Sequence, residues 1–105
     1  MRPNRWYLVG DAVLKHVERV APHVIRKEFR DLCLALQEGP YPGDGVPDIY
    51  PLITEPSVPN AFSVPFDDAL LAYQVTLDMP AVRLLYVHWS TPPQRDEDSQ
   101  EVGPA

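Results

Sequence analysis

The segment 67–89, DDALLAYQVTLDMPAVRLLYVHW, constrains the fold of this chain more than any other, because it predicts two β-strands joined by a tight turn. The strands are expected over Ala69–Leu77 and Ala81–Trp89. Between them, Asp78 can bond its own backbone and Pro80 has a fixed φ, which are features of a turn. Both strands are mostly apolar on both faces, so we expect them at the centre of a sheet that helices cover on at least one side.

Strict alternation along the second strand assigns its side chains to two faces. One face is predicted to carry Val82, Leu84, Tyr86 and His88, and the opposite face Arg83, Leu85, Val87 and Trp89. Tyr73 and Tyr86 are predicted as core aromatics whose hydroxyl groups reach the rim. Function is expected at the exceptions to the apolar pattern, which are Arg83, His88 and Trp89.

The composition indicates one globular domain and a separate acidic tail. The chain has 105 residues, of which 45% are hydrophobic, so it can build a single core, and we expect this domain to span residues 1–90. Residues 91–105 are polar and acidic and are predicted to be disordered. The net charge of −6 at pH 7 argues against general affinity for nucleic acid, whose phosphates require clustered Lys and Arg.

The single cysteine, Cys33, falls in an apolar helical stripe and is predicted to be a buried structural thiol rather than a nucleophile. With one cysteine, no internal disulfide can form. No apolar run approaches the length of a membrane span, and the first residues do not resemble a signal peptide. These features predict a cytoplasmic protein that does not associate with a membrane.

The remaining segments predict an α+β fold. An apolar run at Trp6–Val9 indicates a first strand, and helical spacing of apolar residues predicts helices over Ala12–Ala21 and His23–Gln37. After a Gly- and Pro-rich break, Val46–Ile53 is expected to contain a short edge strand and Ala61–Phe66 a longer strand. This order predicts an N-terminal strand and a helical hairpin packed on a curved, three- to four-stranded antiparallel sheet.

Four basic side chains lie on one arc of the second predicted helix, away from its apolar stripe: His23, Arg26, Lys27 and Arg30. On a helix of 3.6 residues per turn, this arc covers roughly 100°. Two interpretations stay open. The arc is either the solvated face of an amphipathic helix or a binding site for RNA or another anionic partner, which would stand out because the rest of the chain is acidic.

The order of the segments and several short motifs resemble the RelE/ParE superfamily of bacterial toxins, in particular its YoeB-like branch. The motifs are the opening strand WYLV, the helical end LCLALQEGPYPG, the linker GDGVPDIYPL, the strand FSVPFDD, and the final strands LLAYQV and VRLLYVHW. They cover about residues 6–89. The resemblance implies the toxin component of a type II toxin–antitoxin pair, whose partner is a cognate antitoxin that binds through an amphipathic helix or a strand.

The YoeB-like branch cleaves mRNA on the ribosome without a metal, by attack of a ribose 2′-OH on the adjacent phosphate. By resemblance, Asp48 takes the position of the general base and His88 that of the acid for the leaving group, while Trp89 replaces a Tyr. The family's catalytic Arg would fall at Val64–Pro65, and Arg83 is the nearest cation in the strands. Loss of that Arg removes an electrostatic stabiliser of several kcal/mol, so the resemblance implies a weak or inactive ribonuclease.

Two alternatives within the same fold stay open: a non-enzymatic protein-interaction module, and a gyrase-directed toxin, which needs neither the His–aromatic end nor the catalytic Arg. The candidate residues also have structural explanations, because Asp48 suits a turn, His88 a hydrogen-bonded strand end, and Trp89 the edge of the core. The three histidines lack the spacing of a metal site, and no cofactor is expected.

Overall fold

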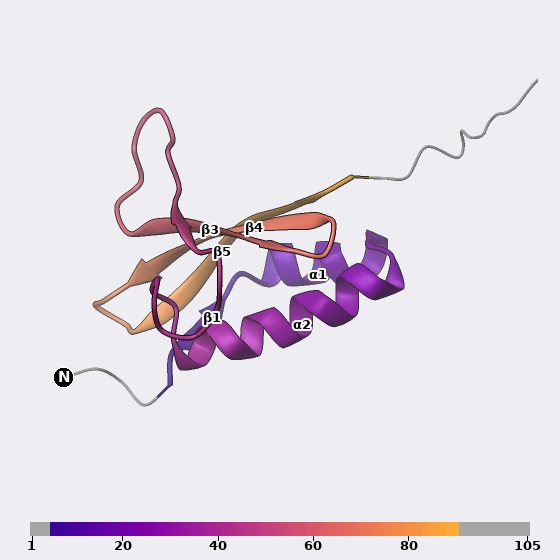
Figure 1. Ribbon diagram of the computed structural model, residues 1–105, viewed down its shortest axis with the longest axis horizontal. Helices are drawn as coiled ribbons and strands as arrows, with labels where there is room; N and C mark the ends of the chain where they lie inside the picture. The colour runs from indigo at the N-terminus through magenta and orange to yellow at the C-terminus, as the bar shows by residue number, and fades with distance from the viewer. Residues whose placement is uncertain (1–4, 91–105) are drawn as a thin grey trace, which may run out of the picture.

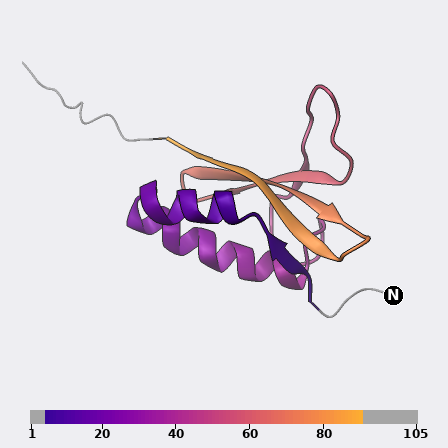
Figure 2. The ribbon, with the colours of Figure 1, turned by 180° about the vertical axis from the view of Figure 1, so that it is seen from behind.

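The helices and strands follow one another in the predicted order. The computed structural model describes residues 5–90 (Figures 1 and 2). Its elements in chain order are β1 (Tyr7–Val9), α1 (Asp11–Val20), α2 (His23–Glu38), β2 (Tyr50–Pro51), β3 (Ala61–Phe66), β4 (Ala69–Thr76) and β5 (Ala81–Trp89). The predicted disordered tail at 91–105 and the first four residues of the predicted domain lie outside the described residues.

The five strands of the described chain form one mixed sheet in the order β1-β5-β4-β3-β2. The strands β2 to β5 pair antiparallel, whereas β1 runs parallel to β5, with Leu8 opposite Val82. The α+β class is therefore confirmed, but the prediction of a three- to four-stranded antiparallel sheet is wrong. Because β1 is not joined to β5 by a hairpin, its direction is not restricted to antiparallel.

Both helices lie on the same face of the sheet (Figures 1 and 2). Val17 of α1 and Ile25, Phe29 and Leu36 of α2 are buried, as the helical spacing predicted. The sheet contributes Val64, Phe66, Leu71, Tyr73, Val75, Val82 and Leu84 to the same core cluster. The core is thus a single layer between the helices and one face of the sheet.

The hairpin of β4 and β5 occupies the interior of the sheet, as its apolar pattern predicted. Tyr73, near the middle of β4, is fully buried, which confirms its prediction as a core aromatic. Its hydroxyl group donates a hydrogen bond to the carbonyl oxygen of Pro40, in the loop that follows α2. The hairpin therefore anchors both its neighbouring strands and the loop that leads to β2.

A β-bulge interrupts the pairing of β4 with β5. Tyr86 lies opposite Ala72, and Leu84 lies opposite Tyr73, so Leu85 is an extra residue on β5. An extra residue exchanges the two faces of a strand for every side chain beyond it.

The bulge overturns the faces predicted for the end of β5. The side chains of β5 that pack toward the helices are Val82 and Leu84 before the bulge, and Val87 and Trp89 after it. Tyr86 and His88 are exposed and point to the opposite face, together with Arg83. The prediction that Tyr86 and His88 share a face with the core side chains of β5 is therefore wrong. Tyr86 is 45% exposed and is not a core aromatic.

Candidate functional site

The sheet face opposite the helices (the open face) carries side chains from all five described strands. They are Tyr7 and Val9 of β1, Arg83, Tyr86 and His88 of β5, Leu70, Ala72, Gln74 and Thr76 of β4, Ala61, Ser63 and Pro65 of β3, and Tyr50 of β2. Neither helix covers this face (Figures 1 and 2). Four large side chains on it are exposed: Tyr7 by 61%, Val9 by 37%, Tyr50 by 61% and Tyr86 by 45%. Exposed aromatic side chains on an uncovered sheet face give it the composition of an interaction surface, in which aromatic residues are enriched.

The charges on the open face differ from those of the rest of the protein. Within residues 5–90, every Asp and Glu lies in a helix or a loop, and no strand contains one. Arg83 is the one Lys or Arg of the described strands, and His88 is their one histidine. The Arg83 guanidinium donates a 3.4 Å hydrogen bond to the side-chain oxygen of Gln74, and among the described residues it forms no ion pair. The open face is therefore aromatic, free of acid and weakly cationic.

The residues that the resemblance suggested for catalysis do not converge. His88 and Arg83 share the open face but lie five positions apart on β5, roughly 15 Å along a strand. Asp48 precedes β2, which is three strand spacings, roughly 14 Å, from β5. A general acid and a general base must each reach a proton of the reacting group within about 3 Å. The backbone separation of Asp48 and His88 therefore argues against a shared role at one phosphodiester.

Trp89 lies on the helix side of the sheet, away from His88. Its ring packs against the core and stacks on the ring of His16 in α1, with a centroid separation of 5.6 Å. This contact fastens the end of β5 to the first helix. The position of Trp89 agrees with its structural explanation as a residue that closes the edge of the core.

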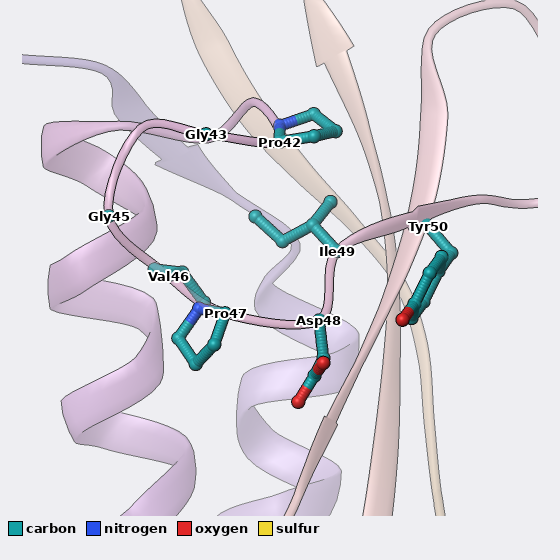
Figure 3. A pocket seen from close by; sticks show the side chains of 8 residues that line it. All are labelled: Pro42, Gly43, Gly45, Val46, Pro47, Asp48, Ile49 and Tyr50. Carbon is teal, nitrogen blue, oxygen red and sulfur yellow. The ribbon is translucent and has the colours of Figure 1, made fainter.

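Asp48 lies in the loop between α2 and β2, which surrounds a shallow pocket of about 370 Å³ (Figure 3). Ile49 points into this loop, whereas Asp48 points out of it (Figure 3). Asp48 has a φ of 62°, a left-handed conformation that Asp adopts more readily than most residues. Besides Asp48, the only titratable residue among those that line the pocket is Tyr50, and the lining holds no histidine, lysine or arginine that could act with the Asp48 carboxylate.

The basic arc of α2 is largely neutralised by neighbouring acids. Lys27 forms an ion pair of 3.1 Å with Asp31, and Arg30 forms one of 3.1 Å with Glu18 of α1. The carboxylate of Asp31 raises the pKa of Lys27 through its hydrogen bond and its charge. Arg26 donates a 3.4 Å hydrogen bond to the Glu18 carbonyl oxygen. These contacts favour the interpretation of the arc as a solvated face that also joins the two helices; His23, at the start of α2, is exposed.

Two buried groups have strongly perturbed acidities. Burial raises the pKa of the Cys33 thiol to about 12, so the thiol stays protonated at neutral pH and is a poor nucleophile. Burial, and to a smaller extent the Asp44 carboxylate, raises the pKa of the Tyr73 hydroxyl. Both shifts come from placement in the core rather than from a reactive cluster.

Residues 5–90 contain no group of three or more His, Cys, Asp or Glu side chains placed to hold a metal ion. Within the same range, no helix has both the length and the apolar character needed to cross a membrane.

The comparisons with known proteins return nothing: no model of a protein family, no curated protein and no solved structure matches this chain. The similarity to the RelE/ParE superfamily thus rests on the sequence motifs alone.

Sequence reasoning missed the residues that define the open face. Tyr7 and Tyr50 were not singled out, and Tyr86 was assigned to the core. The pairing of an exposed tyrosine with small residues across the sheet becomes visible only through the strand register.

Proposed function

We propose that this protein is a non-enzymatic protein-interaction module that binds its partner through the open face of the sheet. The observation that carries this proposal is the exposure of Tyr7, Tyr50 and Tyr86 on a face that neither helix covers. The separation of Asp48 from His88 supports it further, because a reacting centre would need both groups at one phosphate.

The biological setting that we propose is a bacterial type II toxin–antitoxin pair in the cytoplasm, in which this chain is the toxin-like component. The support for this setting is the RelE/ParE-like order of motifs. The partner in that setting is the cognate antitoxin. A gyrase-directed toxin fits the same proposal, because it also acts through protein–protein contact and does not need the missing catalytic Arg.

A second candidate is a weak ribosome-dependent mRNA endoribonuclease. The observation that favours it is the exposure of Arg83, Tyr86 and His88 on a single face, where a single-stranded RNA could contact a cation and stack on an aromatic ring. Arg83 would then replace the family's Arg in charge but not in position.

Expression in a bacterium and incubation in a translating extract separate the two candidates. A ribonuclease slows growth and cleaves mRNA in the extract, and the double variant Asp48→Ala, His88→Ala loses both effects. The interaction module leaves the mRNA intact. Cleavage that depends on His88 would overturn the non-enzymatic proposal, and a supercoiling assay with purified gyrase tests the gyrase-directed form.

A quantitative pull-down tests the interaction itself. The native-host lysate is passed over the wild-type protein, the variant Tyr86→Glu and the variant Val24→Glu. Val24 is 55% exposed on α2 and thus provides a matched apolar-to-acid change away from the open face. We expect a stoichiometric partner that wild type and Val24→Glu retain and that Tyr86→Glu loses. Equal retention by all three proteins would contradict binding through the open face.

A further inference from the structure

We infer that the open face binds an acidic amphipathic helix of a partner protein. This inference rests on the proposed function and adds the chemistry and the shape of the partner segment. Three features of the described chain carry it: the charge on the face, the relief of its surface, and the length of the edge strands.

Charge complementarity selects an acidic partner segment. The chain carries −6 overall, and in residues 6–90 its excess of acid lies in the loops, whereas α1 and α2 are each balanced in charge, so a basic segment would be attracted first to the loops. On the open face the strands present Arg83 and His88 and no carboxylate. Arg83 is exposed, and among the described residues its guanidinium forms a hydrogen bond with the neutral amide of Gln74 and no ion pair. A carboxylate on the partner therefore finds a complementary charge at Arg83 and repulsion at the acidic loops.

The relief of the open face suits the apolar side of such a segment. The register aligns Tyr86, Ala72, Ser63 and Tyr50 in one row across β5, β4, β3 and β2. The two tyrosines at the ends of the row are exposed, and the two residues between them are small. Ala72 is fully buried between its neighbours, so the apolar side chains of a helix would contact the exposed tyrosine rings at either end of the row.

The edge strands argue against the alternative of strand addition. At the two edges, β1 has three residues and β2 has two, which offer too short a row of backbone groups for an added strand. A helix that crosses the open face instead gives the sheet a second helical layer, a common arrangement for a sheet with one uncovered apolar face. The five strands are four spacings wide, roughly 19 Å, and a helix of about 14 residues spans roughly 21 Å.

Two other occupants fit the open face less well. A nucleic acid would need several clustered cations, whereas the strands supply Arg83 and a histidine on an acidic protein. In a second copy of this chain, the same face would bring no carboxylate to Arg83.

A selection from a library of helical peptides tests the inference on the full-length protein. Each peptide has about 14 residues, with Leu fixed at i, i+3, i+4 and i+7 and the flanking positions free to be Glu, Gln or Lys. We expect Glu to be enriched over Lys in peptides that bind the wild-type protein. The selected peptides are then synthesised, and their affinities are measured by fluorescence anisotropy against the variants.

The variants assign the binding to named side chains. Tyr86→Glu and the milder Tyr86→Ala are each expected to lower the affinity for the selected peptides at least about tenfold. Val24→Glu is expected to leave this affinity unchanged. Arg83→Glu is expected to weaken Glu-rich peptides roughly three- to tenfold and to reverse the selection toward Lys. Thermal unfolding of each variant shows that the fold is retained.

Several results would overturn the inference. One is enrichment of Lys over Glu in the peptides that the wild-type protein selects. Another is peptide binding that Tyr86→Glu and Tyr86→Ala do not weaken. A third is a preference for Glu over Lys that Arg83→Glu leaves unchanged. Binding of a single-stranded oligonucleotide that depends on Tyr86 would assign the open face to a nucleic acid and overturn the inference. A dimer of the protein that Tyr86→Glu dissociates would assign the face to a second copy and overturn it as well. A natural partner that depends on Tyr86 but binds through a non-helical or basic segment would overturn the inference alone and leave the proposed function intact.

Discussion

The hydroxyl of Tyr73 donates a hydrogen bond of 2.5 Å to the carbonyl oxygen of Pro40, which lies 33 residues earlier in the chain. Both residues are fully buried, so neither polar group can turn to water instead. This contact ties the middle of β4 to the loop after α2, and therefore fixes where the chain turns toward β2.

Replacement of this tyrosine tests the contact directly. Tyr73→Phe should lower the free energy of unfolding by about 1–3 kcal/mol, because the Pro40 carbonyl loses its buried donor. Tyr86→Phe is the matched control, since Tyr86 is 45% exposed and its stability effect should stay within about 0.5 kcal/mol. Chemical denaturation measures both values, and equal effects of the two variants would contradict a structural role for the Tyr73 hydroxyl.

Gly10 joins β1 to α1 with a positive φ and lies so close to Leu84 of β5 that only glycine fits there. Its φ is 139°, and an added Cβ would lie 2.8 Å from the Cβ of Leu84 in β5. Gly10→Ala should therefore cost about 3 kcal/mol, from backbone strain and the clash together. Gly43→Ala isolates the strain, because Gly43 has a φ of 90° and no heavy atom within 4 Å of an added Cβ.

The expected cost of Gly43→Ala is about 1 kcal/mol. Denaturant melts of the two variants provide the comparison. If Gly10→Ala lowered the free energy of unfolding no more than Gly43→Ala does, the close approach of the β1–α1 connection to β5 would be disproved.

The bulge in β5 offers a third test, by removal of the extra residue. Deletion of Leu85 would restore strict alternation and leave Val87 and Trp89 on the helix side, because Tyr86 would then follow Leu84 in register with β4. The expected loss is therefore less than about 1 kcal/mol.

Deletion of Gln74, which is paired with Arg83, would exchange the faces on one side of the gap in β4 and take Tyr73 or Val75 out of the core, at an expected cost of more than about 3 kcal/mol. Comparable thermal stability of the two deletion variants would argue against Leu85 as the extra residue of the bulge.

The elements that depend on local pattern could be predicted from the sequence. The β4–β5 hairpin, α2 and β3 all have strong periodicity within their own segments, and their bounds agree with the prediction within one residue. The burial of Ile25, Phe29 and Leu36 follows from the same helical spacing. Local pattern also identified the short edge strand among the prolines before residue 53, although β2 itself covers two residues.

The features that depend on long-range pairing could not be predicted. Leu84 and Leu85 are both apolar, so nothing in the sequence marks Leu85 as the extra residue, and the faces of Tyr86 and His88 were exchanged as a result. The parallel partnership of β1 with β5 joins segments more than 70 residues apart. The separation of Asp48 from His88 likewise depends on the order of strands in the sheet, which a motif does not contain.

Cys33 predicts how stability depends on alkaline pH. Burial raises the pKa of its thiol from 9.0 to about 12, so between these pH values the unfolded chain releases a proton that the folded chain retains. The unfolded state is thereby favoured, and the free energy of unfolding should fall as the pH rises above about 9, with a slope from this group of at most about 1.4 kcal/mol per pH unit. Well below pH 9 the thiol is protonated in both states and contributes no slope.

Urea denaturation at a series of pH values from 8 to 11 measures this slope, with Cys33→Ala as the variant that lacks the thiol. Cys33→Ala should be less stable near neutral pH, because a buried side chain is shortened, but its stability should fall less steeply above pH 9. Part of the residual slope is expected from Tyr73, whose pKa is also raised by burial, and that part should disappear in the double variant with Tyr73→Phe. If the wild-type protein and Cys33→Ala lost stability in parallel across this range, the Cys33 thiol would not be the group that titrates.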